Sequence, residues 1–382
     1  MKFDKFDNIF RDATSSFTKV KKEDYKSSGR FPIVDQGQSF IGGYTDNEKF
    51  IEKENLPVII FGDHTKIFKY VDFPFTIGAD GVKVLTLKDK QDNTLFYYYF
   101  LKSIKIVDKG YSRHFKYLKE KKIPVADLPD QLHIANILSK AENLIAQRKE
   151  SIRLLDEFLK STFLEMFGDP VRNEKGWVVS SLSKFGSLKN GLNYTRSESG
   201  INIRCLGVGD FKNHSKLTDI ESLQILNLTT EPSIEYLLKD EDIVFVRSNG
   251  NRELVGRCLL VFPKSEKVTF SGFCIRFRIE KNGLNTVFLS HLFRVPVFRA
   301  SMLHSGKGAN IQNISQQTLE KLKIPTPPTS LQTQFAQIVE NAESLKTQYQ
   351  QSLQELENLY GSLSQRVFRG EIINKTQKAV QV

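Results

Sequence analysis

The fold of this chain is decided by residues 129–168, which read PDQLHIANILSKAENLIAQRKESIRLLDEFLKSTFLEMFG. Apolar residues recur there at steps of three and four, as in a helix that buries one stripe against a partner. Forty residues at about 1.5 Å each form a rod of roughly 60 Å. The predicted stripe contains Ile134, Leu138, Ala141, Ile145, Ile152, Leu155, Leu159 and Met166, and Ile137, Leu144 and Phe158 are expected to widen it.

The same pattern occurs a second time, 201 positions later. Residues 118–168 align with residues 319–369 without a gap, so that Ile123-Pro124 falls on Ile324-Pro325. A fixed offset over this length indicates two halves, each a globular segment followed by a long helix. The second stripe contains Phe335, Val339, Ala342, Lys346, Leu353, Leu356 and Val367, with Ile338, Leu345 and Leu359 expected to widen it.

The two globular segments are predicted to be mixed and rich in strands. Short β-branched and aromatic runs, separated by Gly, Asp and Asn, are typical of strands. We therefore expect an α+β fold with globular segments at 1–128 and 169–328, helices at 129–168 and 329–370, and a tail at 371–382. The expected strands are 31–34, 57–61, 67–71 and 82–87, then 242–246, 257–262 and 273–279, and the expected shorter helices are 93–101 and 287–303.

The net charge of +11 over 382 residues lies in the globular segments. Residues 1–128 carry 23 Lys and Arg against 18 Asp and Glu, and residues 169–328 carry 22 against 15. Residues 129–168 have a net charge of −1, and residues 329–382 a net charge of zero. Two basic lobes on neutral spacers favour a polyanion that is contacted at two places.

The remaining composition excludes several classes of protein. Three cysteines without paired spacing favour a reducing compartment over a disulfide framework or a zinc site. No signal peptide or membrane-spanning run is visible, so a cytoplasmic location without a membrane is expected. We find no nucleotide-binding loop, methyltransferase tetrapeptide or metal-ligand spacing, and therefore expect a binding protein rather than an enzyme.

The order of lobes and repeated helices resembles the specificity subunit of type I restriction–modification enzymes. The resemblance rests on the run 306–315 (GKGANIQNIS), on Ile324-Pro325-Thr326-Pro327-Pro328 and on Gln332, Ile338 and Leu345 after it. Residues 177–182 resemble the start of such a recognition domain. The first half departs from the family pattern, because it lacks counterparts of Trp177 and of the double Pro at Pro327-Pro328. The resemblance covers nearly the whole chain in order.

The resemblance implies two target recognition domains that each read half of a split sequence in double-stranded DNA. Two antiparallel coiled-coil helices would separate them, with a pseudo-twofold axis. The chain itself would hold no cofactor. Methyltransferase (modification) subunits would bring S-adenosylmethionine, and ATP-dependent restriction subunits would bring ATP and Mg²⁺. The specificity subunit of a bifunctional type II-like enzyme stays open as an alternative. A coiled-coil adaptor with two protein-binding lobes and a nuclease in its own right stay open as well.

Candidate DNA-binding residues lie in polar loops between the expected strands. Phosphates are bound by Lys and Arg, and base edges by Arg, Asn, Gln and Ser. The run 247–252 (RSNGNR) is the strongest candidate, because it gathers donors and acceptors around a Gly turn. The candidates are Gln36, Gln38, His64, Lys66, Arg113 and His114 in the first lobe, and Tyr194, Arg196, Arg247, Ser248, Asn249, Arg252, Lys307 and Asn310 in the second.

Overall fold

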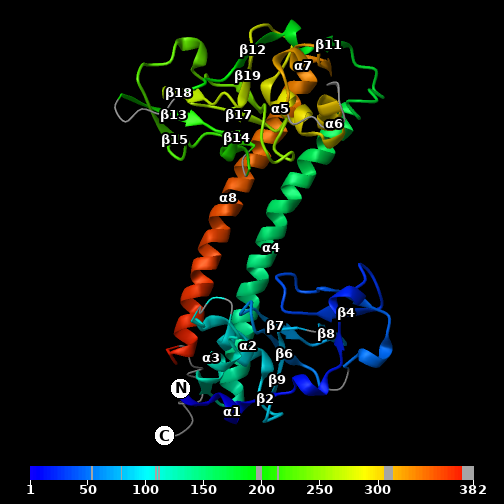
Figure 1. Cartoon of the computed structure of the whole chain (residues 1–382), viewed down its shortest axis with the longest axis vertical. Helices are drawn as coiled ribbons and strands as arrows, with labels where there is room; N and C mark the ends of the chain where they lie inside the picture. Colours follow the sequence, from blue (N-terminus) through cyan, green and yellow to red (C-terminus); the bar gives the residue numbers. More distant parts are fainter. Residues whose placement is uncertain are drawn as a thin grey trace. The chain divides into compact units, whose positions relative to one another are not determined.

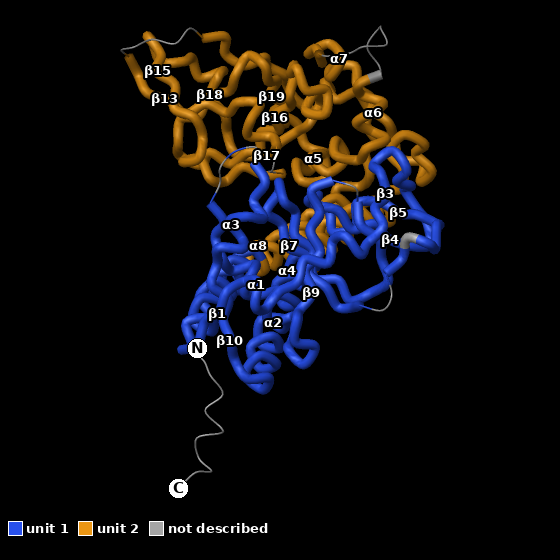
Figure 2. The backbone as a smooth tube through the Cα atoms, turned by 60° about the horizontal axis from the view of Figure 1, so that its bottom comes forward, with its two compact units in different colours: residues 1–150, 350–382 blue, residues 151–349 orange. Residues whose placement is uncertain are grey.

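A computed structural model describes residues 1–52, 55–78, 80–107, 110, 112–194, 200–212, 215–304 and 313–371. The chain forms two compact units, one of residues 1–150 and 350–382 and the other of residues 151–349 (Figure 2). Both long helices pass from one unit into the other. Helix α4 spans Leu128–Phe167 and α8 spans Thr329–Phe368 (Figure 1). The two predicted long helices are therefore confirmed.

Unit 1 is built on two four-stranded sheets. One has the strand order β2-β9-β6-β7 and the other β3-β8-β4-β5. Helix α2 lies on the first sheet, and an apolar core lies between this helix and that sheet. Its elements before α4 are β1 Lys2–Lys5, α1 Phe6–Ile9, β2 Phe10–Asp12, β3 Lys19–Val20, β4 Phe31–Val34, β5 Gly43–Thr45, β6 Val58–Gly62, β7 Phe68–Val71, β8 Thr76–Gly78, β9 Val82–Leu87, α2 Thr94–Ser103, α3 Phe115–Lys119 and β10 Lys122–Val125.

Unit 2 repeats this plan with small changes. Its sheets have the orders β12-β19-β16-β17-β14 and β15-β13-β18. Helix α5 packs on the first of them as α2 does in unit 1. The elements are β11 Val179–Ser181, β12 Gly186–Asn190, β13 Ile201–Leu206, β14 Lys216–Leu217, β15 Gln224–Leu228, β16 Asp242–Val246, β17 Cys258–Val261, β18 Val268–Phe270, β19 Cys274–Ile279, α5 Thr286–Arg294, α6 Pro296–His304, α7 Gln316–Glu320 and β20 Lys323–Pro325.

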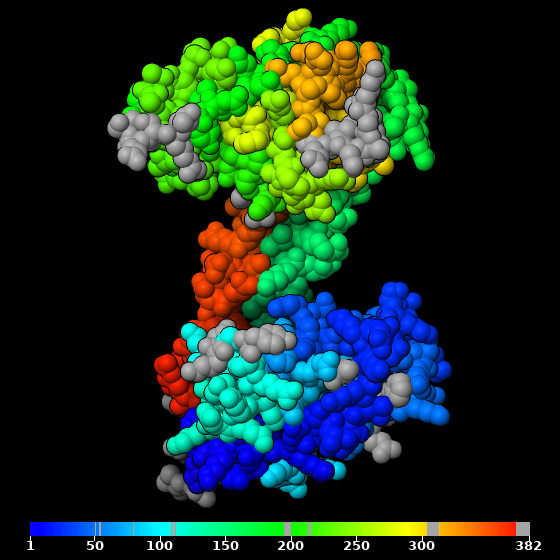
Figure 3. Space-filling model, in the orientation of Figure 1, coloured from blue at the N-terminus to red at the C-terminus, as the bar shows by residue number. Residues whose placement is uncertain are grey.

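Each unit closes on itself through a short antiparallel strand pair. In unit 1, β1 pairs with β10, so that Asp4 lies opposite Ile123. In unit 2, β11 pairs with β20, so that Ser180 lies opposite Ile324. In the space-filling view of Figure 3, orange atoms of unit 2 lie next to green atoms of the same unit. Since Ile123 and Ile324 are 201 positions apart, the internal repeat has the same structural role in both units.

The two long helices pack against each other within each unit. In unit 2 the Asp156 carboxylate pairs with Lys346 Nζ at 2.5 Å, and the Phe163 and Phe335 rings lie 5.4 Å apart. The residue number thus rises along α4 as it falls along α8, so these segments are antiparallel. Unit 1 has its own pair between them, Lys149 Nζ to a Glu357 carboxylate oxygen at 2.8 Å.

Two expectations about helices were wrong. The stripe does not widen at Leu144, Phe158, Leu345 and Leu359, whose side chains are exposed. The helix expected over 287–303 is two helices, α5 and α6, separated at Val295. Val295 is extended (φ −60°, ψ 121°) because Pro296 disfavours a helical conformation at the residue before it. Pro296 itself is the first residue of α6, where the missing N–H costs nothing.

Candidate functional site

In unit 1 three separate segments meet at the end of strand β6. Asp63, directly after the strand, is buried. Its N–H donates to the Gly81 carbonyl at 2.7 Å, and its own carbonyl accepts from the His114 N–H at 2.9 Å. One carboxylate oxygen accepts the Phe115 N–H at 2.7 Å, which stabilises the start of α3. Asp63 therefore joins the β8–β9 turn to the segment that leads into α3.

The loop after β4 brings Gln36 to the same place. The Gln36 side-chain oxygen accepts the His64 N–H at 3.2 Å, and the Thr65 hydroxyl donates to the Gln36 carbonyl at 2.7 Å. The Gln36 amide also lies against Gly81, where a Cβ would overlap it. Two predicted residues, Gln36 and His64, are thus neighbours, although 28 positions separate them in the sequence.

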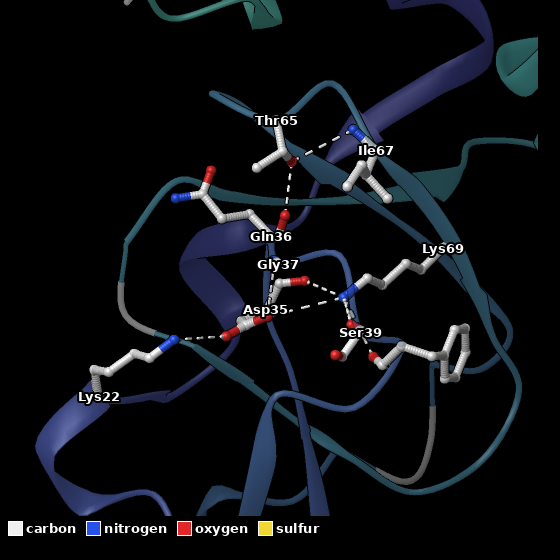
Figure 4. Close-up of polar contacts among 9 residues, drawn as sticks. Lys22, Asp35, Gln36, Gly37, Ser39, Thr65, Ile67 and Lys69 are labelled. Carbon is white, nitrogen blue, oxygen red and sulfur yellow. Dashed lines mark hydrogen bonds and ion pairs between the residues drawn. The ribbon is translucent and has the colours of Figure 1, made fainter. Parts of the chain in front are cut away.

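A buried lysine holds this loop in shape (Figure 4). Lys69 lies on β7 and is 3% exposed. Its Nζ donates to the carbonyls of Asp35, Ser39 and Phe40 at 2.7, 2.6 and 3.2 Å, and lies 3.8 Å from the Asp35 carboxylate. Burial lowers the pKa of Lys69, and the Asp35 charge opposes that shift. The loop therefore has a fixed backbone while the Gln38 and Phe40 side chains are exposed.

Of the other candidates in unit 1, only some are placed to meet a ligand. Arg113 and Gln38 are exposed, and Lys66 is half-buried with φ +61°. His114 is 1% exposed, and its Nδ1 lies 3.0 Å from the Asp63 carbonyl. The proposed DNA contact of His114 is therefore not supported, since the ring packs inside the lobe and cannot reach a base in this conformation.

Unit 2 builds the same backbone framework from different residues. Gly62 pairs with Val82 in unit 1, and Val246 pairs with Cys274 in unit 2, so Asp63 corresponds to Arg247. The Arg247 N–H donates to the Phe273 carbonyl at 2.8 Å, and the Arg247 carbonyl accepts from the Ile314 N–H at 2.8 Å. Asp63 makes the first of these bonds to Gly81. Its carbonyl bonds the same segment one residue later, at His114, which is the N-cap of α3, whereas Ile314 precedes Ser315, the N-cap of α7. An acidic residue in one unit stands where the other has a basic one.

A cleft of about 450 Å³ opens beside this framework in unit 2. Three candidates, Tyr194, Ser248 and Asn249, line it. Arg247 is half-buried and Arg252 is exposed on the turn that follows β16. Arg196, Lys307 and Asn310 lie outside the described residues. The other residues of the lining are Cys205, Gly207, Val208, Gly209, Gln224, Gly250, Ser271 and Phe273.

Two features of the sites escaped sequence reasoning. Lys69 is charged, yet it lies at an inward position of β7, where half-buried and buried residues alternate. This alternation along the strand was the sequence signal that could have predicted its buried side chain. Phe273 is 62% exposed beside Arg247, but nothing about an apolar residue before a strand predicts that its side chain is exposed.

Burial raises the pKa of the Cys205 thiol to about 12, so the thiol in the cleft is neutral.

The described residues hold no group of three or more side chains suited to bind a metal ion. None of the helices in that part of the chain is long and apolar enough to cross a membrane. The sites instead present amides, hydroxyls, guanidinium groups and aromatic rings, which suit hydrogen bonding and stacking.

Comparison with known proteins gives a consistent result. The family described as "Type I restriction modification DNA specificity domain" matches residues 12–154 and 174–358. The specificity subunit of the type I restriction enzyme StySPI from Salmonella potsdam is 24% identical over 267 residues, 65% of this chain and 57% of that subunit. The alignment thus spans less than two thirds of that relative.

Two further specificity subunits of type I restriction enzymes are similar to this chain. The EcoR124I/EcoR124II specificity subunit from Escherichia coli is 32% identical over 148 residues, 37% of this chain and 34% of the subunit. The crystal structure of the type I restriction–modification S subunit from M. genitalium has a TM-score of 0.58 at 18% identity, and the match covers 96% of each chain. At that identity the structural likeness shows the fold alone.

Proposed function

Because this chain belongs to the family of type I restriction–modification DNA specificity proteins, we propose that it reads a DNA target in two halves, one with each unit. The observation that carries this proposal is the repeated framework. Asp63 and Arg247 join the same two neighbouring segments through backbone hydrogen bonds in the two units, but their side chains carry opposite charges. A common scaffold with different side chains is what two readers of different sequences need.

Charge supports DNA as the ligand. The stretches 1–128 and 169–328 hold the positive excess of the chain. Positive charge attracts the phosphate backbone, and amide and hydroxyl groups in adjacent loops suit base edges. Gln38 and Arg113 in unit 1, and Asn249 and Arg252 in unit 2, are the described candidates that combine a suitable side chain with a place at these loops.

We also propose that methyltransferase and ATP-dependent restriction subunits dock on this chain and supply S-adenosylmethionine, ATP and Mg²⁺. The long helices expose apolar side chains on their outer faces, among them Leu144, Leu154, Phe158, Leu164 and Leu359. Apolar groups in such numbers on a helix surface are typical of a surface that a partner covers.

Duplex binding as a function of salt tests DNA reading. The affinity of the chain for DNA should fall steeply as the salt concentration rises, because bound Lys and Arg release counterions. An adaptor with two protein-binding lobes would not bind duplex in this way. The chain alone should neither cleave DNA nor transfer a methyl group from S-adenosylmethionine. Methyl transfer by a preparation free of other subunits would contradict the non-catalytic assignment.

Replacement of one lobe tests the division of labour. If residues 1–120 are exchanged for the matching lobe of a related protein, one half of the recognised sequence should change and the other should stay. The readout is the set of modified sites in DNA from cells that express the hybrid with its methyltransferase subunit. A simultaneous change in both halves would mean that the two units do not read separately.

A further inference from the structure

The strand registers identify which residue of unit 2 corresponds to Gln36. In unit 1 Val34 pairs with Ile77, and in unit 2 Cys205 pairs with Thr269. Ile77 precedes Gly81 by four residues, as Thr269 precedes the equivalent Phe273. Val34 therefore corresponds to Cys205. Two residues further along each chain, Gln36 corresponds to Gly207.

This exchange explains why the cleft occurs in unit 2. In unit 1 the Gln36 amide fills the space between the His64 N–H and Gly81. Gly207 has no side chain, and it lines the cleft of about 450 Å³ together with Ser248 and Phe273, the counterparts of His64 and Gly81. The cleft thus lies where a glutamine side chain lies in the other unit.

The chemistry of the lining favours a neutral planar ligand. None of the described residues that line the cleft carries a charge, since the Cys205 thiol is neutral. A phosphate group would therefore find no cation among these described residues. The amides of Gln224 and Asn249 and the hydroxyls of Tyr194 and Ser248 offer both donors and acceptors. Phe273 adds an exposed aromatic ring, which suits the methyl group of a thymine.

We propose that this cleft receives the edge of a base in the half-site that unit 2 reads, and that Gly207 keeps the cleft open. The position shared by Gln36 and Gly207 then determines specificity: a glutamine amide contacts the DNA target of unit 1, whereas an open cleft accepts part of the target of unit 2. This inference rests on the proposed DNA-reading function and adds a defined subsite to it.

Gly207 is well suited to a direct test, because a side chain fits there without strain. Its φ of −110° and ψ of 173° are ordinary extended values for any residue. Among the described residues, an added Cβ would meet only the Asp210 carboxylate, at 3.8 Å. The hydrogen bond from the Gly207 N–H to Asp210 (2.8 Å) involves the backbone and does not depend on the substitution. Gly207→Gln therefore fills the cleft with the side chain found in unit 1.

The experiment compares the purified full-length chain and its G207Q variant in selection from randomised duplex DNA at low salt. G207Q should change the preferred bases at one or two positions of one half-site and leave the other half unchanged. Its affinity for the wild-type sequence should fall about tenfold or more, the usual cost of a lost base contact. The matched control is Ile234→Gln, which adds the same side chain at an exposed site of unit 2 away from the cleft, and should change nothing.

The reciprocal variant, Gln36→Gly, should change the other half-site only. If G207Q does not fold, Gly207→Ala adds a single methyl group to the cleft and should weaken binding of the wild-type sequence in the same half. The inference is overturned if a folded G207Q or G207A selects the wild-type sequence in both halves with unchanged affinity. Failure of the wild-type chain to select any sequence would instead contradict the proposed DNA-reading function.

Discussion

Gln131 and Gln332, 201 positions apart in the sequence, make two equivalent hydrogen bonds in the two units. Both side chains are completely buried. The Gln131 amide donates to the Ala126 carbonyl at 2.9 Å and accepts the Asn93 N–H at 2.7 Å. The Gln332 amide donates to the Pro327 carbonyl at 2.8 Å and accepts the Asn285 N–H at 2.8 Å. Each glutamine thus ties the residue that caps α2 or α5 to the first turn of a long helix.

Replacement of either glutamine by methionine should destabilise the unit that contains it. Methionine keeps the approximate volume but leaves the partly buried N–H of Asn93 or Asn285 without its acceptor. The expected loss is about 1–3 kcal/mol in the free energy of unfolding, similar for Q131M and Q332M. Urea unfolding measures it. The control, Gln351→Met on the exposed face of α8, should change stability by less than about 0.5 kcal/mol. Equal effects of all three would contradict the assigned role.

The end of α8 is predicted to be essential for unit 1. Phe368 is buried, with its ring 5.6 Å from Phe96 and 5.3 Å from Phe100. Phe368→Ala should therefore cost about 3–5 kcal/mol, as for other buried aromatic residues. Limited proteolysis should then cleave unit 1 more rapidly, while unit 2 keeps its resistance. Phe158→Ala, at an exposed position of α4, is the control and should leave both units resistant.

The equivalent substitution should act on the other unit. Phe167, 201 positions before Phe368, lies 4.7 Å from Phe288 and 5.5 Å from Phe335. Phe167→Ala should thus expose unit 2 and spare unit 1. If both variants destabilised the same unit, the assignment of each helix end to its own core would be wrong.

The parts of this structure that the sequence could predict are those that depend on residues close together in the chain or on the internal repeat. The long helices follow from spacing within one segment, and the repeat follows from residue identity. The exposed Leu144 and Leu359 could not be distinguished from buried residues of the stripe. An apolar stripe of this width does not determine which of its edges faces the partner helix. Pro296 did carry the signal that separates α5 from α6.

The candidate sites were less accessible to sequence reasoning, because they depend on tertiary contacts. Polar residues in loops identified Gln36 and Asn249, and the structure places both at the meeting of loops. The same reasoning chose His114, which packs inside the lobe, since a sequence does not show which side of a turn faces the core. The correspondence of Gln36 with Gly207 needed the strand registers.

Unit 2 is predicted to lose stability in mild acid through His291. Burial, followed by the nearby Arg294 charge, lowers the pKa of His291 from 6.5 to about 3. The unfolded chain therefore takes up the proton first. The stability that His291 contributes is complete above about pH 6.5 and is lost as the pH falls toward 3.

His291→Gln removes this titration. Between about pH 7 and pH 5 the wild-type chain should lose on the order of 1–2 kcal/mol more in its free energy of unfolding than H291Q does. Urea unfolding of both proteins at the two pH values measures the difference. His291 lines a cavity of about 740 Å³ together with Lys160 of α4, Arg257 before β17, Arg294 of α5 and Arg299 of α6. Parallel loss of stability in the two proteins would show that His291 is not the group that titrates.

The long helices are predicted to set the distance between the half-sites. Ile145 and Ile152 of α4, and Leu353 of α8, lie on the predicted apolar stripes of the two helices and are half-buried. Seven added residues keep the stripes in phase and lengthen a helix by roughly 10 Å. Because the helices are antiparallel within each unit, the insertion must be made in both, between Ile145 and Ile152 and at the facing place near Leu353.

The unread gap of the DNA target should then grow by up to about three base pairs, which stack at about 3.4 Å each. The half-site sequences should stay the same, since no lobe residue is altered. The modified sites of the lengthened protein, sequenced from cells that supply the methyltransferase subunit, give both quantities. Insertion into α4 alone is the control: it shifts one stripe against the other by a whole heptad and should abolish specific modification. An active, doubly lengthened protein with an unchanged gap would mean that something other than these helices sets the spacing.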